Sequence, residues 1–192
     1  MYCQHNICKE LTKIGCNGGV AALLFLEYDH RDGRGYTTKV CMLGYENGGK
    51  YKDSYNLCAG RFETEDGGCF LKAIVRELNE EFGINLWENQ AEGEDDWTLF
   101  DAMFKSSSQI RWIQHYNTAV FVGYLSKGTK RTDQNAIMDG NRSKGKAYKE
   151  IDHVGYFRVS DTQRLSSDGK TFKPYAEISS FAASVISKCQ FY

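Results

Sequence analysis

Long apolar runs and an excess of charge of one sign are both missing from this sequence. No apolar stretch approaches the roughly 20 residues that cross a bilayer, and the polar start MYCQHNICKE lacks the apolar core of a signal peptide. The 24 basic and 25 acidic residues leave a net charge of −1, which excludes a polybasic nucleic-acid module on bulk charge. We therefore expect a soluble, cytoplasmic protein with no membrane partner.

A regular cysteine spacing, an internal repeat and a linker are missing as well. The seven cysteines are odd in number and scattered, which indicates free thiols in a reducing compartment. A chain of 192 residues with 41% hydrophobic content is long enough for one well-cored domain. We predict a single domain over residues 1–192, with residues 1–17 as an N-terminal extension and a monomer or homodimer as its assembly.

Strand and helix patterns alternate along the chain. Strand-like composition occurs over residues 18–28, 36–46, 55–58, 98–107, 110–125 and 153–160. The first two of these segments flank the turn DHRDGRG and predict a hairpin. The helical period appears over residues 69–82, where Gly83 stands at the C-terminal cap, and over residues 175–188. This order predicts an α/β fold, an α/β/α sandwich around a mixed sheet.

The segment RELNEEFGI, residues 76–84, places three glutamates at the end of the first helix. Positions i, i+3 and i+4 share a helix face, so Glu77, Glu80 and Glu81 are expected to point the same way. Like charges at this spacing destabilise a helix by about 0.2–0.5 kcal/mol per pair, a cost that a bound cation offsets. Mg²⁺ prefers such oxygen ligands, whereas the alternative is a solvated acidic face.

The same segment resembles the second half of the Nudix box, R-E-U-x-E-E-x-G-U with U aliphatic, at every defined position. Upstream, SYNLCAGRFE is similar to the strand and turn W-x-x-P-G-G-x-x-E, with Ala59 and Gly60 for the glycine pair. The loop is two residues longer than in the family pattern, and Gly68 stands where the first box glutamate belongs. Glu65 or Asp66 is a candidate replacement from this extended loop.

This resemblance implies a metal-dependent pyrophosphohydrolase that cleaves a nucleoside diphosphate linked to another moiety, or a related phosphoanhydride. It implies Mg²⁺ or Mn²⁺ bound by Glu77, Glu80 and Glu81 and by a backbone carbonyl at Ala59 or Gly60. Metal ions neutralise the pyrophosphate and lower the pKa of an attacking water. Either Glu77 or Glu81 would also act on that water.

Further roles follow from the resemblance. Arg76 would orient Glu77 by a salt bridge, and Gly60 and Arg61 would contact the substrate. Glu150 is a candidate general base, with an exposed loop charge as the alternative. A Nudix-fold module that binds a nucleotide or a protein without cleaving it is the alternative function.

Residues 127–149 are polar and basic, sustain neither period, and predict a long loop. Lys130, Arg131 and Arg142 in this segment are candidates to bind a phosphate-rich substrate. Such a substrate is a small molecule, for example a dinucleoside polyphosphate or an inositol pyrophosphate, or a capped RNA. A plain solvated loop is the alternative.

Aromatic residues offer a second kind of substrate contact. Trp97, Trp112 and Tyr116 either stack on a base or form part of the sheet core. His115 and His153 lie in strand-like runs and are expected to be packed histidines.

Overall fold

The computed structural model describes residues 6–29, 37–84, 111–124, 134–158, 163–165, 172–173 and 177–189. The helices are α1 (Asn6–Lys13), α2 (Phe70–Phe82), α4 (Gln134–Asn141) and α5 (Ser180–Cys189). Short 3₁₀ turns are η1 (Thr64–Asp66), η4 (Arg142–Lys144) and η5 (Ala147–Lys149). The strands are β1 (Gly19–Asp29), β2 (Thr37–Glu46), β3 (Tyr55–Asn56), β4 (Cys58–Gly60), β5 (Arg111–His115), β6 (Thr118–Tyr124), β7 (Ile151–Arg158), β8 (Gln163–Leu165) and β9 (Phe172–Lys173).

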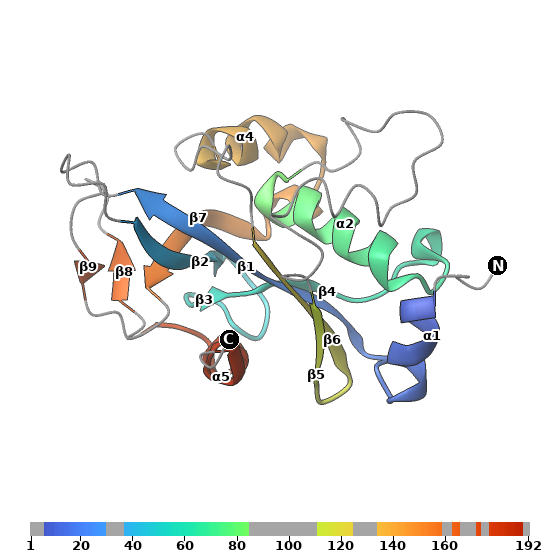
Figure 1. The fold of residues 1–192 in the computed structure, drawn as a ribbon. Coiled ribbons are helices and arrows are strands. Elements are labelled where there is room, and N and C mark those ends of the chain that lie inside the picture. The colour runs from blue at the N-terminus through green and yellow to red at the C-terminus, as the bar shows by residue number, and fades with distance from the viewer. Residues whose placement is uncertain are drawn as a thin grey trace.

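These strands form one mixed sheet in the order β5-β6-β1-β2-β7-β8-β9, with β3 beside β2 and β4 beside β1 (Figure 1). The predicted hairpin is confirmed, because β1 and β2 pair antiparallel with Leu24 opposite Met42. β1 pairs in parallel with β6, and the other pairings between the strands named above are antiparallel.

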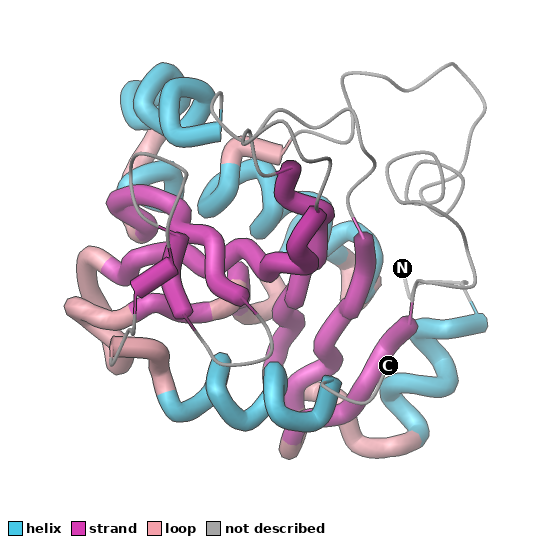
Figure 2. Tube along the Cα trace, turned by 60° about the vertical axis from the view of Figure 1, so that its left-hand side comes forward, coloured by secondary structure: helices cyan, strands magenta, loops and turns pink. Residues whose placement is uncertain are grey.

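Alternate side chains of β1 enter two apolar cores on the two faces of the sheet. Ala22 and Leu24 pack with residues of α1, α2 and α4, whereas Leu23 and Phe25 pack with residues of α5. This alternation is the period of a strand that is buried on both faces. Figures 1 and 2 show α5 on the side of the sheet opposite α2 and α4, so the predicted α/β/α sandwich is confirmed.

Within the strand-like segment 110–125, the described residues 111–124 form a tight pair of strands. β5 and β6 pair antiparallel from Arg111 opposite Val122 to His115 opposite Thr118. Within this pair Trp112 belongs to the core against Phe121, with ring centroids 5.3 Å apart. Trp97 and the predicted strand over residues 98–107 lie outside the described part of the chain.

Part of the predicted N-terminal extension forms a helix that packs on the core of the domain. Residues 6–13 form α1, whose Cys8 and Leu11 are buried in the same core as α2. The Sγ atoms of Cys8 and Cys69 lie 3.9 Å apart, and the six described cysteines are buried. The segment is therefore packed onto the domain through a short amphipathic helix.

The predicted loop over residues 127–149 is wrong for residues 134–149, which form α4, η4 and η5. The formation of α4 is explained better by its tertiary contacts than by the weak helical period of its sequence. The buried side chain of Gln134 donates to the Phe82 carbonyl, and the Val154 N–H donates to Asn135 Oδ1 at 2.8 Å. These bonds join α4 to the end of α2 and to β7, and the sequence alone does not indicate either of them.

The C-terminal helix begins later than its period predicts. Ile178 lies in an isolated bridge beside Tyr55, and α5 starts at Ser180. Its buried residues are Ala182, Val185, Ile186 and Cys189. No helix in the described ranges is long and apolar enough to cross a membrane.

Candidate active site

Helix α2 carries the charged residues of the site and is defined at both ends by local chemistry. It begins after Cys69, which has an extended backbone, and ends at Gly83 with φ 65°. The Gly83 N–H donates to the Asn79 carbonyl at 3.1 Å, which is the bond of an αL C-cap motif. The predicted helix and its glycine cap are thus confirmed.

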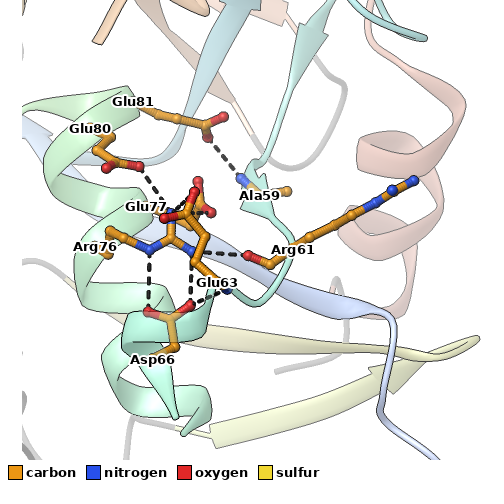
Figure 3. Close-up of polar contacts among 8 residues, drawn as sticks. All are labelled: Ala59, Arg61, Glu63, Asp66, Arg76, Glu77, Glu80 and Glu81. Atoms are coloured by element: carbon orange, nitrogen blue, oxygen red, sulfur yellow. Dashed lines mark hydrogen bonds and ion pairs between the residues drawn. The ribbon is translucent and has the colours of Figure 1, made fainter. Parts of the chain in front are cut away.

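Arg76 is the centre of the polar contacts in the site (Figure 3). Its Nη1 donates to Glu77 Oε1 at 2.8 Å and to Glu80 Oε2 at 3.0 Å. Its Nε and Nη2 donate to the two oxygens of Asp66 at 3.2 and 3.0 Å. Nη2 also donates to the Arg61 carbonyl at 2.9 Å, while the Arg61 side chain extends away from the carboxylates. Arg76 therefore holds the helix and the preceding loop in one arrangement.

Asp66 is the acidic residue of the extended loop that contacts Arg76. It is 4% exposed, and the Glu63 N–H donates to its Oδ2 at 2.8 Å. Glu65 is exposed, and no ion pair joins it to Arg76 in the described part of the chain. Of the two candidates for the missing box glutamate, Asp66 thus occupies the position beside the arginine.

A side chain at Gly60 of β4 would collide with the Glu77 carboxylate of α2. A Cβ atom at Gly60 would lie 1.8 Å from Glu77 Oε1. The neighbouring Ala59 N–H donates to Glu81 Oε2 at 2.8 Å. Ala59 thus presents a donor to the carboxylate, whereas the resemblance implies a backbone carbonyl near a metal.

Burial raises the pKa values of the three glutamates of α2. Glu77 is 7% exposed, and burial raises its pKa to about 7 although the Arg76 charge opposes the rise. Burial also raises the pKa of Glu81 well above its ordinary value, and the Glu77 charge adds to this rise. The pKa of Glu80 is raised by burial against the effect of Arg76. The site therefore holds more buried acid than Arg76 alone compensates.

The three glutamates extend from the same side of α2, as expected, but they have different partners. Arg76 holds Glu77 and Glu80, whereas Glu81 turns to Ala59 (Figure 3). In the ranges that the structure describes, no group of three or more acidic, histidine or cysteine side chains is arranged to hold a metal ion. The all-oxygen donor set nevertheless suits a hard divalent cation, provided that Glu80 and Glu81 rotate away from their present partners.

A pocket of about 510 Å³ lies at the end of β2, and the α2 carboxylates are not among its described lining residues. Its lining includes Glu46 at the end of β2, Lys146 and Lys149 near η5, and Glu150. Burial is the main cause of the raised pKa of Glu46 and of Glu80, and the charge of the exposed Glu150 adds to both. Glu150 therefore lies within electrostatic reach of the α2 carboxylates, from which it is distant in sequence.

Of the three residues predicted to bind phosphate, the structure describes Arg142. Arg142 Nε donates to Asp139 Oδ1 at 2.8 Å, and its Nη2 donates to the Asp152 carbonyl. The guanidinium is thus already paired with acidic and carbonyl oxygens. Lys130 and Arg131 lie outside the described residues.

The sequence interpretation did not single out Glu46 as a site residue, whereas Lys146 and Lys149 belong to the basic segment 127–149 that was expected to contact a phosphate-rich substrate. Glu46 ends a strand that was predicted only as part of a hairpin, and Asn56 Nδ2 donates to its Oε1 at 2.9 Å. The turn NGG that follows Glu46 is the one local signal that the chain bends there to form a concave surface.

The sequence matches no protein-family model and no curated protein sequence. Among solved structures, the chain is similar to the Nudix domain of NrtR from Shewanella oneidensis in complex with ADP ribose. The TM-score is 0.48 at 10% identity, over 90% of this chain and 85% of that one. It is also similar to a bifunctional NMN adenylyltransferase/ADP ribose pyrophosphatase from Francisella tularensis complexed with AMP and a Mn ion. That comparison has a TM-score of 0.46 at 11% identity, over 95% of this chain and 45% of that one.

Proposed function

We propose that this protein is a metal-dependent Nudix pyrophosphohydrolase that cleaves a nucleoside diphosphate linked to another moiety, or a related phosphoanhydride. The observation that carries the proposal is the Arg76 side chain, which binds Glu77 and Glu80 of the RELNEEFGI helix and Asp66 of the preceding loop. Because Arg76 pairs with all three of these carboxylates, it fixes the positions of Glu77, Glu80 and Asp66 relative to one another.

The metal ligands in this proposal are Glu77, Glu80 and Glu81, with a backbone carbonyl at Ala59. The raised pKa values of the buried Glu77 and Glu81 support it, because a cation nearby would favour the ionised form of each carboxyl. Bound Mg²⁺ or Mn²⁺ supplies positive charge against the phosphates and makes a water molecule more acidic.

The other residues position the carboxylates or move a proton. Arg76 orients Glu77, and the absence of a side chain at Gly60 leaves space for that carboxylate. Glu150 is proposed as the general base, because its exposed carboxylate lies beside the pocket and can accept a proton from water. Glu77 and Glu81 are the alternative bases.

The phosphate-rich part of the substrate is proposed to bind in the pocket beside Lys146 and Lys149. Arg142 is a weaker candidate because Asp139 already pairs with it. Lys130 and Arg131, which precede α4 in the sequence, are proposed to add to this basic surface. Suitable substrates are nucleoside diphosphate conjugates, dinucleoside polyphosphates, inositol pyrophosphates and capped RNA.

The test is hydrolysis of a substrate panel with Mg²⁺ or Mn²⁺, with products resolved by chromatography. The panel contains NADH, ADP-ribose, nucleoside triphosphates, dinucleoside polyphosphates, capped RNA and inositol pyrophosphates. We expect cleavage that EDTA and Glu80→Gln both abolish and that Glu65→Gln leaves unchanged, because Glu65 is exposed and does not pair with Arg76. Cleavage that survives Glu80→Gln would contradict the proposed ligand set.

A Nudix-fold binding module that does not cleave its ligand is the second candidate. The observation that favours it is the engagement of Glu80 by Arg76 and of Glu81 by Ala59, which leaves neither carboxylate directed at a common point. Tight binding of one panel member without any cleavage, at saturating metal, would support this candidate over the hydrolase.

A further inference from the structure

A second pocket, of about 390 Å³, lies on the face of the sheet opposite α2. It is formed between the β5–β6 turn, the segment at Lys50 and Tyr51, and the first turn of α5. The core beneath it is the one that contains α5, whereas α2 and its carboxylates belong to the other core. Figure 1 shows α5 and α2 on opposite sides of the strands. This pocket is therefore separate from the candidate active site.

Aromatic rings form its walls. The rings of Tyr51 and Phe181 are nearly parallel, with an interplanar angle of 16° and centroids 6.4 Å apart. His115 contacts Phe181 at 5.2 Å between centroids and the Tyr116 ring at 4.7 Å. Such rings offer flat apolar faces on which another planar ring can stack.

Tyr116 is held at the rim of this pocket in a strained backbone conformation. Its φ is 53°, a value that a bulky residue rarely adopts, and its side chain is 84% exposed. A glycine would fit the turn between β5 and β6 without this strain, so neither turn geometry nor core packing accounts for a tyrosine here. Strain of this kind is concentrated at ligand-binding sites.

His115 lines the pocket and has one ring nitrogen that bonds no described residue. The residue is 6% exposed, and its Nδ1 lies 3.2 Å from Lys188 Nζ. Because an ammonium group only donates, Nδ1 accepts and the proton of the neutral ring lies on Nε2. No described residue accepts the Nε2–H, so a polar donor of a buried ring is left for a ligand.

The pocket also favours negative charge. Lys50 lines it, with Nζ 5.0 Å from the centroid of the Tyr51 ring, and no carboxylate lines it in the described part of the chain. Ser180 and Phe181, the first residues of α5, lie at the same pocket, and the amino end of a helix attracts anions. A ligand that combines a planar ring with an anionic group therefore matches both the aromatic walls and the positive charge of this pocket.

We propose that this pocket binds a nucleotide unit, with the base against Tyr116 and the neighbouring rings and the phosphate near Lys50 and the amino end of α5. The unit is either a free nucleoside monophosphate or one nucleotide of an RNA strand. The proposal does not depend on hydrolase activity, because the pocket shares no residue with the carboxylate site.

The experiment is isothermal titration of the full chain with AMP in EDTA, repeated for two variants of one residue. Tyr116→Phe keeps the ring and should bind AMP as the original protein does. Tyr116→Gly removes the ring and the strain together, so AMP binding should weaken about tenfold or more while the melting temperature stays equal or rises. A structural role for the ring would instead lower the melting temperature.

Two further comparisons identify the ligand and the site. Adenosine and ribose 5-phosphate, which carry one half of AMP each, should both bind more weakly than AMP, and Lys50→Met should weaken AMP but not adenosine. Tighter binding of oligoadenylate RNA than of AMP would identify an RNA strand as the source, and equal binding a free nucleotide. AMP binding that Tyr116→Gly leaves unchanged, or that Glu77→Gln abolishes, would overturn the proposal.

Discussion

The Glu77 carboxyl should make the metal-free protein less stable as the pH rises. Burial raises its pKa from 4.5 to about 7, so the folded protein binds this proton more tightly than the unfolded chain does. The resulting stabilisation is fully present below about pH 4.5 and is lost as the pH rises through about 7. The full effect corresponds to about 3 kcal/mol in the free energy of unfolding.

The assay is urea unfolding at pH 5 and pH 8 in EDTA, for the original protein and for Glu77→Gln. Glutamine has the shape of the protonated carboxyl and cannot titrate, so the variant lacks this contribution at both pH values. We expect the original protein to lose about 2–3 kcal/mol more than the variant between the two pH values. Added Mg²⁺ should stabilise the original protein more at pH 8, because the ion binds ionised carboxylates.

The raised pKa of Glu81 makes the stability of both proteins fall with pH in the same direction. Because the Glu77 charge adds to that rise, the difference between the two proteins reports on Glu77 together with its coupling to Glu81. The same pH dependence in both proteins would refute the reasoning, since it would mean that Glu77 is no harder to ionise in the folded state than in the unfolded one.

Three further predictions concern the contacts around α2. Gly60→Ala places a methyl group where a glutamate oxygen lies 1.8 Å away, and should lower the free energy of unfolding by about 1–3 kcal/mol in urea titrations. Asp66→Asn breaks the buried pair with Arg76 and should cost about 3 kcal/mol, whereas Glu65→Gln should change the stability by less than about 0.5 kcal/mol. Gln134→Ala removes the donor to the last carbonyl of α2 and should cost about 1 kcal/mol, with faster amide hydrogen exchange in α4 as the second readout.

The sequence pattern was most informative where contacts are local. The period of residues 69–82 and the glycine at position 83 predicted α2 to within one residue, because helix formation and capping depend on neighbours three to five positions apart. Alternating apolar runs around a polar turn predicted the β1–β2 hairpin for the same reason. The weak pattern of residues 134–149 predicted a loop, and tertiary bonds from Gln134 and Asn135 made part of it a helix.

In the candidate site, too, the sequence predicted the local features and not the contacts between distant segments. The spacing of the box placed Arg76 and the three glutamates on one helix, and that much follows from the order of residues alone. The directions in which the carboxylates point did not follow, because Arg76 and the Ala59 N–H compete for them across the loop. The sequence also left the choice between Glu65 and Asp66 open.

The sequence by itself determined the β1–β2 hairpin, the acidic helix α2 and the class of chemistry proposed for that helix. Only the tertiary structure decided that Asp66 pairs with Arg76, that Glu46 and Glu150 lie at one pocket, and that Tyr116 meets the start of α5 at another. The physical reason is the range of the interactions. Helix period and capping act over a few residues, whereas these contacts join segments that only the register of the sheet and the packing on its two faces bring together.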